Sequence, residues 1–249
     1  EQHFVSSKVM CWVALDRGAR IATKLKKAEY AARWREEAEA IHRDVMEHGW
    51  KKEIQSFSQA YGNLALDSSL LLMEPYGFIA ANDPHYRKTV EAVHKALFHK
   101  GLMYRYNSKD DFGVPNSAFT MCTFWLIRAL LVTGQYNEAK TLFNQILQYG
   151  NHLGLFSEHL DFDTKEQLGN FPQPTRTWRS STQRCFLPKK NSGWISSDHN
   201  NINGSIAANN FCSRIFNPCT MVGFTVWGEI CHNVVPRFDK NEVWKRLKQ

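Results

Sequence analysis

The sequence lacks any long apolar run. A membrane-spanning helix needs about 20 predominantly apolar residues, whereas the longest apolar stretch here, 119–132, is interrupted by Thr120, Thr123 and Arg128. We therefore expect no membrane span and no membrane partner. The amino end has neither an initiating methionine nor a basic segment followed by an apolar one. We thus expect the sequence to begin inside a longer protein.

Closely spaced cysteines are also missing. The six cysteines show no Cys-x-x-Cys spacing, so the sequence predicts no zinc site, no other metal and no cofactor. Cys11 and Cys122 lie in apolar segments with helical periodicity and are expected to be buried thiols. The other four follow residue 173, where a disulfide framework remains open as the less favoured alternative.

The body of the chain lacks net charge. Residues 1–173 contain 20 Lys and Arg and 20 Asp and Glu, whereas residues 174–249 contain 11 and 4. The net charge of +7 therefore arises entirely in the last segment. Because a nucleic-acid-binding domain shows clustered positive charge, the neutral body predicts no nucleic-acid partner.

Leucine is scarce after residue 173. The 76 residues of 174–249 contain 2 leucines against 18 in residues 1–173, and 9 asparagines against 8. No apolar stripe with a period of about 3.6 residues persists there. We divide the chain at this point into a folded domain, 1–173, and an irregular, disordered tail, 174–249. The tail's aromatic residues and cysteines fit ordinary disorder poorly.

What the first 173 residues do contain is a series of helical patterns. A more apolar segment precedes a two-faced one in each of three pairs: about 8–25 and 28–48, 64–73 and 84–99, and 117–133 and 136–149. Capping residues support three of the starts, at Ser6-Ser7, Asp83-Pro84 and Asn116-Ser117. The alternation predicts an all-α fold in which three helical hairpins form an inner and an outer layer.

Three connections from an outer to an inner helix are longer than most loops of a compact domain: 49–63, 100–116 and 150–172. In a two-layer arrangement of hairpins they emerge at the same rim. The last carries four acidic residues, of which Glu158 lies in the Gly-containing stretch 154–161. A carboxylate on a loop held by helices is typical of acid–base catalysis, although most acidic loops are only solvated.

Four motifs stand out in residues 7–173. They are Ser7-Lys8-Val9-Met10-Cys11-Trp12-Val13-Ala14-Leu15-Asp16-Arg17, Ala65-Leu66-Asp67-Ser68-Ser69-Leu70-Leu71, Tyr104-Arg105-Tyr106 and Leu168-Gly169-Asn170-Phe171-Pro172-Gln173. In this order they resemble glycoside hydrolase family 15, and more narrowly its bacterial-type glucoamylase and trehalase-like members. The resemblance covers about residues 3–173 and implies a partial (α/α)6 barrel, roughly half of its six helical hairpins. It also implies an inverting hydrolase that cleaves an α-glucoside or oligosaccharide in carbohydrate metabolism.

The resemblance assigns a role to one carboxylate. The catalytic base of the family is the Glu of a Ser-Glu loop, and Glu158 in Phe156-Ser157-Glu158 resembles it. Its implied role is to deprotonate a water molecule that attacks the anomeric carbon with inversion.

Substrate-binding residues are expected in the loop around Arg105. This residue resembles the family arginine that contacts sugar hydroxyls, for which its fixed donors are suited. An ion pair with Asp110 or Asp111 is the structural alternative, weighted equally. Tyr106 and Asp111 are the other substrate-binding candidates. Tyr104 and Tyr106 belong either to a sugar platform or to the core, and we favour the core.

Two departures from the family pattern limit the expected activity. The first concerns the family's catalytic acid, a Glu in a Trp-Glu motif upstream of the His-Phe that His3-Phe4 resembles, so that it would precede residue 1. Because inverting hydrolysis needs both carboxylates, we expect this chain to be inactive by itself.

The second departure follows Gln173. Family members continue with an inner helix of the type Ser-His-Leu-Ala-Leu-Ile-Asn-Ala-Ala, which is absent here. Codons permitted for residues 175–184, read one frame over, can spell that family sequence. We therefore hypothesise a frameshift just after Gln173 and interpret 174–249 as out-of-frame translation. Sequencing the nucleic acid across these codons tests it.

A helical-repeat interaction module is the alternative function. Gly134-Gln135-Tyr136-Asn137-Glu138-Ala139 resembles part of a tetratricopeptide unit, but no period of about 34 residues relates it to the other helices. The sequence does not reveal which α-glucoside is the substrate, nor the oligomeric state. The compartment is also open, with the cytoplasm preferred.

Overall fold

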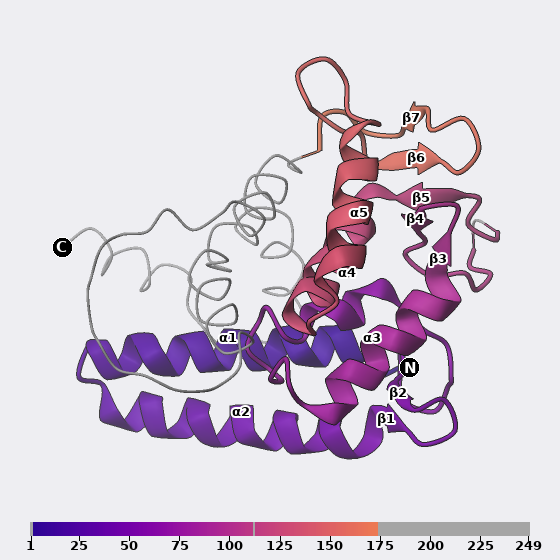
Figure 1. The fold of residues 1–249 in the computed structure, drawn as a ribbon. Helices are drawn as coiled ribbons and strands as arrows, with labels where there is room; N and C mark the ends of the chain where they lie inside the picture. Colours follow the sequence, from indigo (N-terminus) through magenta and orange to yellow (C-terminus); the bar gives the residue numbers. More distant parts are fainter. Residues whose placement is uncertain (1, 112, 174–249) are drawn as a thin grey trace, which may run out of the picture. The chain divides into compact units, whose positions relative to one another are not determined.

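The computed structural model describes residues 2–111 and 113–173. The predicted disorder of the tail, the boundary after residue 173 and the frameshift hypothesis concern residues outside this part. Within it, six helical elements form three successive pairs (Figure 1). They are α1 (Val5–Lys24), α2 (Ala28–His48), the 3-10 helix η1 (Ser68–Leu72), α3 (Pro84–Leu97), α4 (Thr120–Val132) and α5 (Tyr136–Leu147).

The pairs form the two predicted layers. Each outer helix packs on the inner element before it: α2 on α1, α3 on η1, and α5 on α4. The inner elements also contact one another in chain order, because α1 contacts η1 and η1 contacts α4. This pattern of neighbours confirms the prediction of inner and outer helices.

The three long connections fold into short antiparallel strands, which the all-α prediction did not include. The strands are β1 (Trp50–Lys51), β2 (Ser56–Phe57), β3 (Phe98–His99), β4 (Leu102–Met103), β5 (Ser117–Phe119), β6 (His159–Asp161) and β7 (Gln167–Leu168). β1 pairs with β2 and β3 with β4, while β5, β6 and β7 form a three-stranded sheet in that order. Two or three residues are too few to show the alternation by which a strand is recognised in a sequence.

Helix α4 is far more buried than helix α1. Ten of the 13 residues of α4 are buried, as its apolar sequence predicts. Only four of the 20 residues of α1 are buried, so the expectation that α1 resembles α4 is wrong. Among the described helical elements α4 lies against η1, α3 and α5, whereas α1 lies against α2 and η1. α1 is also much less apolar than α4, so sequence and neighbours together account for the difference.

The two described cysteines follow the same division. Cys122 on α4 is fully buried, and burial raises the pKa of its thiol. Cys11 on α1 is only half-buried, which corrects the prediction of a buried thiol.

The helix starts were predicted with mixed success. Asp83 caps α3 as expected, since its Oδ1 accepts a hydrogen bond of 2.8 Å from the backbone N–H of His85. Ser6-Ser7 is not a cap, because α1 already begins at Val5. Asn116-Ser117 is not a cap either, because Ser117 opens β5 and pairs with Asp161.

The segment 64–73 contains the 3-10 helix η1 rather than the predicted α-helix. Asp67 starts it by accepting a hydrogen bond of 2.6 Å from the backbone N–H of Ser69. A 3-10 helix is usual for so short a run of helical residues.

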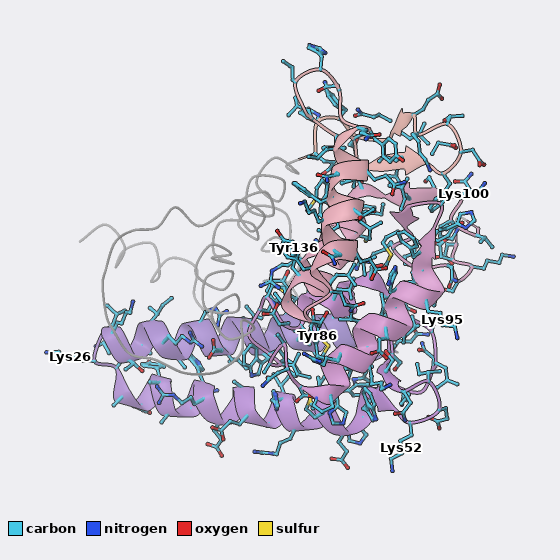
Figure 2. The ribbon with its side chains drawn as sticks, viewed as in Figure 1. Lys26, Lys52, Tyr86, Lys95, Lys100 and Tyr136 are labelled. Atoms are coloured by element: carbon cyan, nitrogen blue, oxygen red, sulfur yellow. The ribbon has the colours of Figure 1, made fainter. Side chains whose placement is uncertain are left out.

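Figure 2 shows a filled centre and a charged periphery: Tyr86 lies among the helices, while Lys26, Lys52, Lys95 and Lys100 lie at the edge. Tyr86 is fully buried, and its hydroxyl donates a hydrogen bond of 2.9 Å to the carbonyl of Leu71. In the described part of the chain, none of the helices is both long and apolar enough to cross a membrane.

Candidate active site

The first turns of α4 hold the segment that contains Glu158. The backbone N–H of Thr120 donates a hydrogen bond of 2.9 Å to the carbonyl of Glu158. One of the N–H groups that the start of a helix leaves unpaired is thereby satisfied. Phe156, fully buried, packs edge-on against Phe124 of α4, with 5.6 Å between ring centres. The expected functional loop is therefore fixed to the core on both sides of Ser157.

The side chain of Glu158 is held through one oxygen. Its Oε2 accepts a hydrogen bond of 2.9 Å from the side-chain amide of Asn170 and a longer one, 3.4 Å, from the backbone N–H of Asn170. The backbone N–H of Glu158 in turn donates to the carbonyl of Asn170 over 2.9 Å. Gly169 has a φ of +74°, and a Cβ there would lie 3.2 Å from Oε2. The carboxylate therefore has one anchored oxygen, while Oε1 has no hydrogen bond to a described residue.

The other acidic residues of this connection have different roles. Asp161 Oδ1 accepts hydrogen bonds from the backbone N–H groups of Asp163 and Thr164, at 2.7 and 2.8 Å, and these bonds lower the pKa of Asp161. The Asp163 carboxylate pairs with Lys100. Glu166 is exposed. The solvated-loop interpretation therefore suits Asp163 and Glu166, whereas Asp161 ends β6 and stabilises the turn that follows it. Of the four, Glu158 is the one bonded to the first residue of α4.

Arg105 forms an ion pair, but with a partner that the sequence did not indicate. Its Nε donates to Asp67 Oδ1 over 2.9 Å, and its guanidinium carbon lies 5.6 Å from the ring centre of Trp125. The predicted alternative, an ion pair with Asp110 or Asp111, is therefore wrong about the partner. Asp67 precedes η1, which lies far from Arg105 in the sequence, so no local pattern could reveal the pair.

The remaining candidates lie beside Arg105 without converging on one point. Tyr106 is half-buried, and its hydroxyl donates a 2.5 Å hydrogen bond to Asp110, which raises the pKa of the phenol. Asp111 is exposed. Tyr104 packs against buried Phe162 with 4.3 Å between ring centres, in keeping with a core position. No hydrogen bond or ion pair joins Tyr106 or Asp111 to Glu158 in the described residues.

Helix α4 connects the two parts of the candidate site. Thr120 bonds the Glu158 segment, and Trp125 lies against Arg105. Between them, Thr123 Oγ1 accepts a hydrogen bond of 3.0 Å from the backbone N–H of Met103, two residues before Arg105. Thr120 and Trp125 are five residues apart, which corresponds to about 7.5 Å of rise along a helix. Glu158 and Arg105 are thus attached to neighbouring turns of one buried helix.

Several buried polar atoms in these segments have no hydrogen-bond partner in the described residues. They are Ser69 Oγ, Thr120 Oγ1, Trp125 Nε1 and Gln167 Oε1. Buried polar groups normally have a partner, so a group of exceptions calls for an explanation. Binding of a polar ligand or ordered water here would supply the partners. Among the residues that the structure describes, no group of three or more His, Cys, Asp or Glu could hold a metal ion.

The sequence matches the family model of glycosyl hydrolases family 15 over residues 1–138, more than half of the chain. The chain belongs to this family. The trehalase of Mycobacterium tuberculosis is 42% identical over 175 residues, which are 69% of this chain and 26% of that enzyme. The trehalase of Thermoplasma volcanium is 34% identical over 173 residues, or 69% of this chain and 28% of the enzyme. This family 15 chain therefore spans about a quarter of the length of these trehalases.

Solved structures support the fold of the family 15 chain. A glycosidase in complex with glucose matches with a TM-score of 0.57 at 21% identity, over 64% of this chain and 42% of that one. A bacterial glucoamylase complexed with acarbose matches with a TM-score of 0.53 at 16% identity, over 66% and 31%. At these identities the likeness concerns the fold alone, and it identifies the two layers as part of an (α/α)6 barrel.

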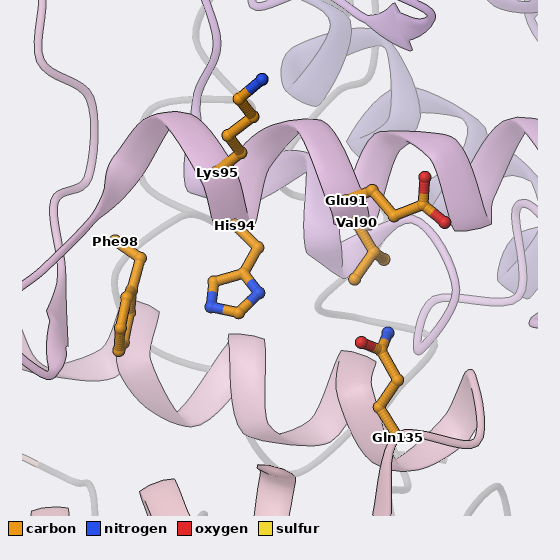
Figure 3. Close-up of a pocket in the computed structure, with 6 residues that line it drawn as sticks. All are labelled: Val90, Glu91, His94, Lys95, Phe98 and Gln135. Carbon is orange, nitrogen blue, oxygen red and sulfur yellow. The ribbon is translucent and has the colours of Figure 1, made fainter.

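An open pocket of about 300 Å³ lies apart from the Glu158 and Arg105 segments, between α3 and the start of α5 (Figure 3). Its lining comprises Val90, Glu91, His94, Lys95, Phe98 and Gln135. His94 lies edge-on against Phe98, and its Nε2 is 3.8 Å from a carboxylate oxygen of Glu138 on α5. Burial lowers the pKa of His94, and the charge of Glu138 opposes this shift.

Acidification is expected to destabilise the chain partly through His94. Because the pKa of His94 is lower in the folded state, the unfolded state binds the proton first as the pH falls below about 6.5. The free energy of unfolding therefore decreases as the pH falls from about 6.5 to the folded-state pKa of His94. We expect His94→Gln to reduce this loss by less than about 1 kcal/mol, because the side chain is partly solvated. Urea unfolding at about pH 7.5 and about pH 5.5 measures it. His48→Gln, at an exposed position of α2, is the control, and equal effects of both variants would contradict the assignment.

Proposed function

We propose that this chain is part of an inverting glycoside hydrolase that acts on α-linked glucosides, with trehalose as the substrate. The observation that carries the proposal is the attachment of Glu158 and Arg105 to adjacent turns of α4, with one oxygen of Glu158 anchored by Asn170. Trehalose is preferred over starch because the trehalases are 31–42% identical to this chain, whereas the glucoamylase structure is 16% identical.

In the proposed reaction Glu158 is the general base. Its anchored Oε2 fixes the orientation of the carboxylate, and Oε1 takes a proton from a water molecule. The water oxygen attacks the anomeric carbon as the bond to the glycosidic oxygen breaks, so that the configuration is inverted. Arg105 holds sugar hydroxyls through its Nη groups, for which no hydrogen bond to a described residue is present. A general acid must protonate the leaving oxygen.

We propose that this acid comes from a part of the enzyme that this chain does not contain. In support, the chain spans only about a quarter of the length of the trehalases that it resembles, and an inverting enzyme needs a second carboxyl group about 6.5–9.5 Å from the base. The chain alone is then expected to release little or no glucose. The helical-repeat alternative gains no support, because the inner elements of the first two pairs, α1 and η1, have 20 and five residues, so the hairpins are not equivalent units.

A hybrid enzyme tests the proposal. Residues 1–173 replace the region that they match in the trehalase of M. tuberculosis, so that the remainder of that enzyme supplies the rest of the barrel. We expect the hybrid to release glucose from trehalose and to act more slowly on maltose. A hybrid with native-like circular dichroism and cooperative unfolding that hydrolyses neither sugar would contradict the proposal.

The glycine beside Glu158 provides a sharper test of the geometry. In Gly169→Ala the new Cβ would lie 3.2 Å from Glu158 Oε2 and displace the carboxylate, so we expect about a tenfold loss of hybrid activity. The matched control is Gly62→Ala, where φ is +78° and no atom lies within 4 Å of the added Cβ. Both variants carry a similar backbone strain of about 1 kcal/mol. Equal activity losses in the two variants would show that contact with Glu158 is unimportant.

A further inference from the structure

Asp67 is a nearly buried carboxylate at the start of η1, with 6% of its surface exposed. One of its oxygens, Oδ1, accepts two hydrogen bonds: one of 2.6 Å from the backbone N–H of Ser69 and one of 2.9 Å from Arg105 Nε. The same oxygen therefore starts the 3-10 helix and orients the arginine. A carboxylate held in this way has little freedom to rotate.

A second pair of contacts joins the two segments. The backbone N–H of Ser68 donates to the carbonyl of Arg105 over 2.8 Å, and the hydroxyl of Ser68 donates to the carbonyl of Tyr104 over 2.6 Å. The backbone of Arg105 is thus fixed independently of its side chain. Loss of the Asp67 carboxylate would free the guanidinium and remove the cap of η1, while the two hydrogen bonds from Ser68 would still hold the loop.

The guanidinium is held on two sides and open on the third. Nε bonds Asp67, and one face lies over Trp125. The Nη groups have no hydrogen bond to a described residue, and 36% of the side chain is exposed. Ser69 Oγ and Trp125 Nε1 are also buried without a partner in the described residues. The open edge of the arginine therefore lies in a segment with further unused hydrogen-bonding atoms.

We propose that Asp67 is a positioning residue, which holds Arg105 through Nε so that both Nη groups present their donors to the hydroxyls of a sugar. This inference rests on the proposed function, because it deepens the role of Arg105 at the same site. Asp67 acts only through Arg105 and does not touch the substrate. Its negative charge also balances the charge of a guanidinium that is partly withdrawn from water, which an uncharged acceptor would not do.

The first arm of the test uses the full 249-residue chain and needs no activity. Hydrogen exchange of the Arg105 Nε–H group is followed by NMR in the wild type, Asp67→Ala, Asp67→Asn and Ser69→Ala. We expect about tenfold faster exchange in Asp67→Ala, from loss of one charge-assisted hydrogen bond, and a smaller change in Asp67→Asn, which keeps an acceptor oxygen. Ser69→Ala removes a hydroxyl that bonds neither Asp67 nor Arg105, so it should exchange as the wild type does.

The second arm measures kcat and KM in the hybrid trehalase. We expect Asp67→Ala to lower kcat/KM about tenfold or more and Asp67→Asn to recover part of it, while Glu166→Gln, at an exposed position outside the site, leaves it unchanged. Equal exchange rates in Asp67→Ala and the wild type would overturn the proposal, as would faster exchange with unchanged kinetics. If the wild-type hybrid itself is inactive, the proposed function fails, whereas the exchange data still decide whether Asp67 holds Arg105.

Discussion

Glu158→Gln is expected to lower the rate of glucose release by the hybrid trehalase about 10²- to 10⁴-fold, the range attributed to general acid–base catalysis. Glutamine has the shape of glutamate, and its amide oxygen can still accept the hydrogen bond of 2.9 Å from Asn170. The variant therefore keeps the anchor and loses the ability to take a proton from water. We expect KM for trehalose to change little and kcat to carry the loss.

The matched control for Glu158 is Glu166→Gln in the same connection. Glu166 is exposed, and its side chain has no hydrogen bond or ion pair to a described residue, so we expect wild-type rates. If the Glu158→Gln and Glu166→Gln hybrids both retained activity, Glu158 would not be the general base. If both hybrids lost activity, the negative charge of the loop would be needed for activity, and the loss could not be assigned to a single base.

The second large effect concerns stability. Glu74, after η1, and Arg128 on α4 form an ion pair in which 13% and 3% of the side chains are exposed. We expect Glu74→Leu to lower the free energy of unfolding by about 3–5 kcal/mol, because it removes a carboxylate that pairs with a buried guanidinium. Urea unfolding of the 249-residue chain measures the change.

Two further variants distinguish a buried ion pair from ordinary packing. The double variant Glu74→Leu with Arg128→Met replaces both charges by apolar groups, and we expect it to regain most of the loss. Glu91→Ala breaks the exposed pair of Lys88 with Glu91, whose side chains are 54% and 61% exposed, and it should cost less than about 1 kcal/mol. If Glu74→Leu lowered the free energy of unfolding no more than Glu91→Ala does, a large contribution from the buried pair would be contradicted.

Much of the helical framework was predictable because helices have a local pattern. The period of the apolar residues located α2 at its observed bounds and placed the other α-helices within a few residues. The 3-10 helix η1 was misassigned, because a short apolar run after Asp67 does not distinguish the two helix types. The burial of α1 was overestimated, because α1 is less apolar than α4 and contacts fewer of the described helical elements.

The candidate site was predictable only where it follows motifs. The motifs indicated Glu158 and Arg105 and contained Asp67 and Asn170, but the pairing of Asp67 with Arg105 and of Asn170 with Glu158 emerged only from the fold. The contact of Arg105 with Trp125 likewise emerged only from the fold. Asp67 and Arg105 are separated by 38 positions in the sequence, and Asn170 meets Glu158 only because β6 and β7 fold back on each other. Long-range contacts of this kind leave no trace in local periodicity. The catalytic and substrate-binding roles of these residues remain predictions.

Helix α4 has a consequence for how such an enzyme can change over evolution. It fixes the spacing between the Glu158 segment and the Arg105 side chain, because Thr120 bonds the first and Trp125 lies against the second. Substitutions in the connections that carry Glu158 and Arg105 can accumulate while the spacing set by α4 is preserved. We therefore expect new sugar preferences to arise in the connections, whereas α4 keeps the spacing of its two attachments.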